Sequence, residues 1–127
     1  MALTLDPVEI ENEATRAGIA EVARYLQEHL GQKLTAYLAG VRDPKMVGKW
    51  ARGTEPRDAS AMRLRAAFQA TRMLAAVYGD ASAKAWFVGS NTRLDDEAPA
   101  WVLRHAQAPD DLRLLVPTAR AFAGAGD

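Results

Sequence analysis

Residues 85–103 read AWFVGSNTRLDDEAPAWVL, and the organisation of the whole chain follows from them. An aromatic segment runs into Gly89, which suits a left-handed helix end because glycine has no Cβ to clash. The polar residues after it are turn formers, with Leu94 as a single apolar residue among them. Pro99 fits the first position of a new helix, where its missing N–H is not needed. The pattern predicts a helix, a short loop with one buried leucine and a second helix, and it offers no nucleophile, metal cage or phosphate loop.

The chain of 127 residues is long enough for one compact domain, or for two small units that share a core. A charged fraction of 25% beside an apolar fraction of 49% argues against wholesale disorder. The absence of cysteine excludes a disulfide framework and a thiolate metal site. No apolar run approaches the roughly 18 residues of a membrane span, and residues 1–6 lack the features of a secretion signal. We therefore expect a soluble, cytoplasmic protein with no membrane partner.

The formal net charge of zero conceals a gradient along the chain. Residues 1–31 carry six acids and two bases, residues 41–75 carry eight bases and three acids, and residues 76–127 carry five bases and seven acids. A local basic band can bind phosphate groups even in a neutral protein. The same band is also typical of a solvated face, so the charge alone leaves both interpretations open.

The N-terminal part shows helical periodicity. Apolar residues recur at helical spacing over residues 19–30, and a glycine ends that helix. A short helix follows, for which we expect Leu34, Tyr37 and Leu38 to face inward, and Gly40 ends it.

Residues 43–53 predict a second short helix after a turn. Asp43 can cap it, Pro44 begins it, and Val47 and Trp50 point inward. Two short helices joined by a turn, the second with bases outside and an apolar anchor inside, form the layout of a helix-turn-helix. The bases on the outer face and at the two ends are the candidate DNA contacts: Arg42, Lys45, Lys49 and Arg52.

An alternative explains the same residues. Gly48, between the two lysines, would let the backbone approach DNA closely, but any small helical hairpin exposes lysines in this way. From Leu34 to Val47 the unit is also two residues longer than the commonest helix-turn-helix pattern. The sequence leaves DNA recognition and a plain helical hairpin both open.

A long helix follows over residues 58–78, and its wide apolar arc predicts cover on several sides. Its 21 residues span about 30 Å, so we expect it to be the shared spine of an all-α protein. Pro109 opens a last helix, in which Pro117 predicts a kink or a break. The expected fold is a helix-turn-helix half joined by the central helix to a small helical C-terminal domain, with domains at residues 1–78 and 79–127.

Little in the sequence favours catalysis. The chain has two histidines, His29 and His105, and no cysteine, which makes a nucleophile–base pair unlikely on composition. The acids of residues 95–97 are sequence neighbours and do not converge on one face, so a solvated loop is preferred to a metal site. We therefore expect a protein that is not an enzyme and has no cofactor or metal.

Two parts of the sequence resemble a known family. Residues 39–53, AGVRDPKMVGKWARG, are similar to the helix-turn-helix half of the Xre/MbcA/ParS antitoxins. Ala85-Trp86-Phe87, with Asn91, Leu94 and Pro99, resemble the W…N…L…P core of that family's C-terminal toxin-binding domain. Both parts occur in the family's order.

The resemblance implies an all-α protein that pairs with a RES-domain toxin, an enzyme that consumes NAD. The C-terminal domain would cover the toxin's active site, and the N-terminal half would bind promoter DNA, as a homodimer or as a hetero-oligomer with the toxin. The chain departs from the family at residues 95–98, where the family often has Gly-Gly, a small spacer and a hydroxyl cap. The core motif implied is Trp50, Trp86, Asn91, Leu94, Pro99 and Leu103, and position alone offers Trp101, Arg104, Arg120 and Asp127 for toxin contact.

The sequence therefore favours one function and leaves one alternative. The first is an antitoxin of a type II toxin-antitoxin system, which occludes the RES-type toxin and regulates transcription of its own promoter. The alternative is a stand-alone helix-turn-helix DNA-binding transcriptional regulator. A neighbouring reading frame for a compact NAD-consuming enzyme would favour the first.

Overall fold

The computed structural model describes residues 8–10 and 18–124, and the described part of the chain is helical with no strand. The all-α fold predicted from the sequence is confirmed. Residues 8–10 are helical, and the elements that follow are α2 (Ile19–Leu30), α3 (Gln32–Ala39), α4 (Lys45–Ala51), α5 (Asp58–Tyr78), α6 (Asp80–Val88), the 3-10 turn η1 (Thr92–Leu94), α7 (Pro99–His105), the 3-10 turn η2 (Pro109–Leu112) and α8 (Leu115–Gly124).

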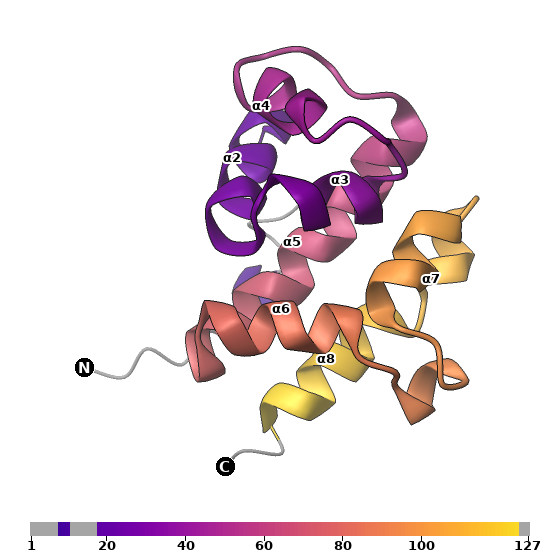
Figure 1. The fold of residues 1–127 in the computed structure, drawn as a ribbon. Helices are drawn as coiled ribbons and strands as arrows, with labels where there is room; N and C mark the ends of the chain where they lie inside the picture. The colour runs from indigo at the N-terminus through magenta and orange to yellow at the C-terminus, as the bar shows by residue number, and fades with distance from the viewer. Residues whose placement is uncertain (1–7, 11–17, 125–127) are drawn as a thin grey trace.

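Helix α5 is the spine of the molecule. Figure 1 shows it running through the middle, with α2, α3 and α4 above it and α6 and α8 below. It packs against α2, α3, α6, α7 and α8, which explains why apolar residues occupy most of its circumference. Its buried residues are Ser60, Leu64, Ala67, Phe68, Ala70, Thr71, Met73 and Leu74.

Helices α2 and α3 are joined by a single glycine, Gly31, whose φ of +85° is open to glycine and strained for other residues. The inward face of α3 differs from the prediction in one place. Leu38 is buried and Leu34 is half-buried, but Tyr37 is 39% exposed. Thr35 is buried instead, because its hydroxyl donates hydrogen bonds to the carbonyls of Gly31 at 2.7 Å and Leu26 at 3.2 Å.

The segment at residues 85–103 forms α6, η1 and α7, as predicted. Trp86 and Phe87 are buried and meet edge to face, with ring centroids 5.1 Å apart. The one correction concerns Gly89, which ends α6 in an extended conformation, with φ −88° and ψ 152°, and not in a left-handed one. A Cβ at this position would lie 3.2 Å from the carbonyl oxygen of Ala85, which is a tight contact. Glycine suits this helix end because it has no side chain.

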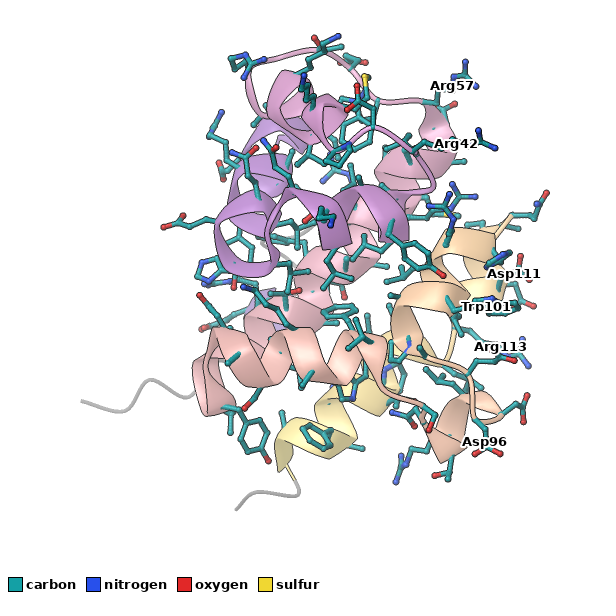
Figure 2. All side chains as sticks on the ribbon, viewed as in Figure 1. Arg42, Arg57, Asp96, Trp101, Asp111 and Arg113 are labelled. Atoms are coloured by element: carbon teal, nitrogen blue, oxygen red, sulfur yellow. The ribbon has the colours of Figure 1, made fainter. Side chains whose placement is uncertain are left out.

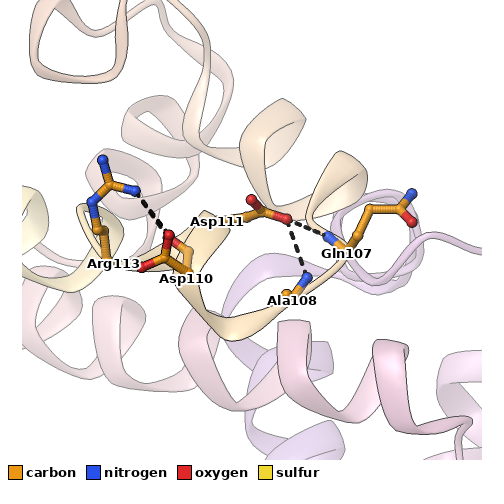
Figure 3. A network of polar contacts seen from close by, with 5 residues as sticks. All are labelled: Gln107, Ala108, Asp110, Asp111 and Arg113. Atoms are coloured by element: carbon orange, nitrogen blue, oxygen red, sulfur yellow. Dashed lines mark hydrogen bonds and ion pairs between the residues drawn. The ribbon is translucent and has the colours of Figure 1, made fainter.

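The last predicted helix is divided in two. The chain forms η2 from Pro109, turns, and begins α8 at Leu115, so that Pro117 is the third residue of α8. A proline in the first turn removes an N–H that has no intrahelical partner, so it costs no hydrogen bond there. The predicted break therefore exists, but it precedes the proline. Figure 3 shows how Asp111 holds the backbone directly before η2. One of its carboxylate oxygens accepts hydrogen bonds from the N–H groups of Gln107 and Ala108, at 2.8 and 3.1 Å.

One continuous hydrophobic core serves both halves of the described chain. It includes Val22 and Trp50 from the N-terminal half and Phe87, Leu103 and Leu115 from the C-terminal half. The sequence allowed either one compact domain or two units with a shared core, and a single continuous core is compatible with both. Among the described helices, none is long and apolar enough to cross a membrane.

Candidate nucleic-acid interface

Helix α4 is held from both ends of its seven residues. At its start, Asp43 Oδ1 accepts the Lys45 N–H at 2.9 Å, which is the capping role predicted for Asp43. Val47 and Trp50 are buried, as predicted, so one side of the helix is anchored in the core. At its end, Arg24 of α2 donates from Nη1 to the carbonyl of Ala51 at 2.9 Å, which satisfies an acceptor that the helix leaves open.

The turn from α3 to α4 is sharply defined. The Val41 N–H donates to the carbonyl of Ala36 at 3.0 Å and the Gly40 N–H to that of Tyr37 at 3.1 Å. Gly40 is left-handed, with φ +89° and ψ 20°. This is the hydrogen-bond pattern of a Schellman helix end, which reverses the chain and delivers α4 against α2 and α3. Two short helices, α3 and α4, are thus joined by a turn over residues 40–44.

The four bases predicted as DNA contacts all lie on the surface around α4. Arg42, Lys45, Lys49 and Arg52 are exposed, and none forms an ion pair with another described residue. Lys45 and Lys49 are one turn apart on the same helix side. Helix α4 itself contains no acid, and the exposed Asp43 lies directly before it. Figure 2 shows Arg42, and also Arg57 from the start of α5, directed outward from the upper part of the molecule.

Gly48 does not have the role expected of it. It is buried, and a Cβ built on it would lie 3.2 Å from Gln32 Nε2 and from Arg52 Nη1. Gln32 donates to Gln27 Oε1 at 2.7 Å, so two glutamines of α2 and α3 pack over the glycine. Gly48 therefore permits close packing inside the protein, and it offers no bare backbone to a ligand.

A second cluster of positive charge lies where the ends of α3 and α7 meet the start of α5. Arg63 of α5 donates from Nη1 to the carbonyl of Ala39 at 3.1 Å, and from Nη2 to the carbonyl of Ala106 at 2.7 Å. Arg104 of α7 donates from Nη1 to the carbonyls of Tyr37 at 2.7 Å and Val41 at 3.4 Å. Burial, and then the charge of Arg104, lower the pKa of Arg63 from its ordinary value.

Sequence reasoning did not single out Arg63. In the sequence, Arg63 only interrupts the apolar arc of the helix at residues 58–78. No local signal indicates that it binds the ends of two other helices. Arg104 was named from its position on α7 as an exposed residue, but it is half-buried against α3. Its guanidinium carbon lies 4.7 Å from the centre of the Tyr37 ring, a cation–π contact with the exposed tyrosine.

The other residues predicted for toxin contact are dispersed. Trp101 is 42% exposed and stacks on His105, with ring centroids 4.1 Å apart. Arg120 is exposed on α8. Asp127 lies outside the described residues. No hydrogen bond or ion pair of the described structure joins Trp101, Arg104 and Arg120 to one another.

The predicted core motif is a structural core. Its apolar members and Pro99 are buried, and Asn91 accepts the Arg93 N–H on its side-chain oxygen at 3.0 Å to cap η1. The next loop contains Asp95 and Asp96, both with positive φ, of +56° and +66°. These are the positions at which the resembled family often has Gly-Gly. The buried members of the motif are Trp50, Trp86, Leu94, Pro99 and Leu103.

The histidines make structural contacts. His29 Nδ1 lies 2.7 Å from Asp80 Oδ1, which joins the end of α2 to the start of α6. His105 Nδ1 lies 2.9 Å from the carbonyl oxygen of Trp101 in its own helix. Within the described residues, no group of three or more histidine and acidic side chains is placed to hold a metal ion.

Comparison of the chain with protein families, with curated proteins and with solved structures found no match.

Proposed function

We propose that this protein is an antitoxin of a type II toxin-antitoxin system, which binds promoter DNA through α4 and occludes a RES-type, NAD-consuming toxin through its C-terminal half. The single observation that supports the DNA-binding part best is the surface around α4. Four exposed bases surround a short helix that contains no acid, and Val47 and Trp50 fix that helix in the core. Such a helix presents Lys45 and Lys49 to a major groove while bases at its two ends reach phosphates.

Support for the toxin-binding part comes from the loop between α6 and α7. The chain resembles the antitoxin family in the residues that form this core, and its backbone is left-handed at Asp95 and Asp96, where that family often has glycines. Trp101 follows on α7 with a large exposed aromatic surface, which is the type of residue enriched at the centre of protein interfaces. We propose that the complex forms in the cytoplasm.

Co-expression with the product of the adjacent gene tests this function. We expect growth arrest when that product is expressed without this chain, and normal growth when both are present. Deleting residues 99–127 is a poor test of toxin contact, because the deletion removes Ala100, Leu103 and Leu115 from the core. The substitution Trp101→Ala removes an exposed aromatic surface and leaves the core intact.

We expect the Trp101→Ala variant to fold and to lose co-purification with the toxin, and a matched Val88→Ala variant, which alters a residue 63% exposed on α6, to retain it. Retention of the complex by both variants would exclude the surface around Trp101. An adjacent product without toxicity, together with tight binding of the chain to its own promoter, would favour the stand-alone regulator.

A further inference from the structure

Two arginines meet at the C-terminal end of α3 without a carboxylate between them. Arg63 and Arg104 donate to carbonyls of residues 37–41, and Arg63 also donates to the carbonyl of Ala106, directly after α7. Within the described residues, neither guanidinium forms an ion pair. Among the described residues, their negative partners are the carbonyl ends of two helices, α3 and α7.

The charge compensation by these two helix ends is incomplete. A helix C-terminus is equivalent to about half a negative charge, so the ends of α3 and α7 supply about one negative charge for two guanidinium groups. About one positive charge remains at this junction. The lowered pKa of Arg63, caused by burial and by the charge of Arg104, agrees with such an excess. Gly40 leaves no room for a side chain that could supply a counter-charge, since even a Cβ there would collide with Arg63 Nη1.

Arg104 has capacity for a further ligand. Both of its hydrogen bonds are made by Nη1, and its Nε and Nη2 have no partner in the described part of the chain. The Tyr37 ring, 4.7 Å from the guanidinium carbon, fixes the plane of the group. A guanidinium held in one plane with two free donors is suited to an oxyanion, because it need not lose side-chain freedom on binding.

The position of this junction indicates which oxyanion. Arg104 donates to the carbonyl of Val41, the residue before the exposed Arg42, and α4 begins at Lys45. Arg104 therefore binds the backbone directly before Arg42, the first of the four bases around α4. A ligand that lies along the surface around α4 and carries oxyanions at regular spacing is a nucleic-acid backbone.

We propose that Arg104, a residue of the C-terminal half, contacts a phosphate of the DNA backbone, flanked by Arg42. This inference rests on the proposed DNA-binding function and extends it, because it assigns one DNA contact to α7. Arg104 then belongs to the DNA surface, and its earlier assignment to toxin contact is replaced. A carboxylate of a partner protein is the competing ligand for the same group.

Phosphate contacts do not depend on base sequence, so the test needs no operator. The probe is a fluorescein-labelled duplex of mixed sequence, roughly two helical turns or about 20 base pairs long. Binding is measured by fluorescence anisotropy at several potassium chloride concentrations for the full chain and for three variants, Arg104→Gln, Arg104→Lys and Arg42→Gln. The control is Arg120→Gln, which removes the same charge from an exposed position on α8.

The slope of log K against log salt is negative, and each lost phosphate contact reduces its magnitude by about 0.9. We expect that decrease for Arg104→Gln and for Arg42→Gln, and an unchanged slope for Arg120→Gln. The weakening caused by Arg104→Gln should itself diminish about 3.5-fold between 50 and 200 mM salt, as this slope requires. Arg104→Lys retains the charge and should retain the slope. A purely structural arginine would change the unfolding midpoint of these variants and leave the slope as it is.

The inference would be overturned if the salt slope of duplex binding were the same for Arg104→Gln as for the unmodified chain. Loss of toxin binding by Arg104→Gln with the slope intact would also overturn it, in favour of a protein carboxylate. Duplex binding that depends on Lys45 and Lys49 but not on Arg104 would leave the proposed function standing without this inference. If the chain bound no duplex at any salt concentration, both the proposed DNA-binding function and this inference would be wrong.

Discussion

The substitution Gly40→Ala tests the junction between the two halves. Gly40 has φ +89° and ψ 20°, a conformation that costs a residue with a Cβ about 1–2 kcal/mol. The new Cβ would also collide with Arg63 Nη1 and displace the guanidinium from the carbonyl of Ala39. A hydrogen bond made by a charged group contributes about 1.5–3 kcal/mol. We therefore expect Gly40→Ala to lower the free energy of unfolding by about 3–4 kcal/mol.

The measurement is a double-mutant cycle with Arg63→Met, followed by urea denaturation. In the Arg63→Met background the collision is absent, so Gly40→Ala should cost only its conformational part, about 1–2 kcal/mol. The two substitutions should thus be coupled by about 2 kcal/mol. Gly53→Ala is the matched control, since Gly53 also has a positive φ, of +115°, but a Cβ there meets no atom within 4 Å.

Additive effects would refute this reasoning. Gly40→Ala could lower the free energy of unfolding equally in both backgrounds, to within about 0.5 kcal/mol. In that case the Arg63 guanidinium moves aside without losing a hydrogen bond that contributes to stability. If Gly53→Ala costs as much as Gly40→Ala, the left-handed backbone accounts for the whole effect. For a chain of this size the expected loss corresponds to a fall in Tm of about 10–15 °C, which a thermal melt would record independently.

Four further outcomes are expected. Replacing Lys45 and Lys49 together by alanine should lower the salt slope of duplex binding by about 1.8, measured by anisotropy, because two phosphate or groove charges are lost; an unchanged slope would remove both from the interface. Leu103→Ala, at a fully buried position, should lower the free energy of unfolding by about 2–5 kcal/mol in urea, and a loss below about 1 kcal/mol would mean that α7 is not part of the core. Trp101→Ala, at an exposed position, should cost less than about 1 kcal/mol in the same assay. Asp96→Gly should raise stability by about 0.5 kcal/mol, because glycine adopts a φ of +66° without strain, and a loss of stability would show that the carboxylate holds the loop.

The helices were predictable where local signals coincide. Glycines with positive φ precede or follow α2, α3, α4 and α5, and the structure places them at Gly31, Gly40, Gly53 and Gly79. Prolines mark the starts of α7 and η2, and apolar spacing marks the buried faces. The errors arose where tertiary contact decides. Tyr37 was expected to face inward but is exposed, and its ring is in cation–π contact with Arg104 of the distant helix α7.

The candidate site was predictable only in part, for the same reason. The bases of α4 lie on one short helix and its flanks, so their common surface follows from spacing alone. The junction of Arg63 and Arg104 joins residues separated by more than 20 positions from the carbonyls they contact. Nothing in the local sequence of either arginine specifies its partners, because those partners are backbone atoms of other helices. Gly48 was misread in the same way, as its covering glutamines come from α2 and α3.

The shared core governs how the chain can be degraded. Because α7 and α8 are packed on the same spine as α2 and α3, no helix of the described part can detach without exposing residues such as Leu103 or Val22. We therefore expect cleavage within this part to require opening of the core, so that the rate of proteolysis follows the global equilibrium. A bound partner at either end, at free concentration L, would stabilise the entire chain by RT ln(1 + L/Kd) and lengthen its lifetime by the factor 1 + L/Kd.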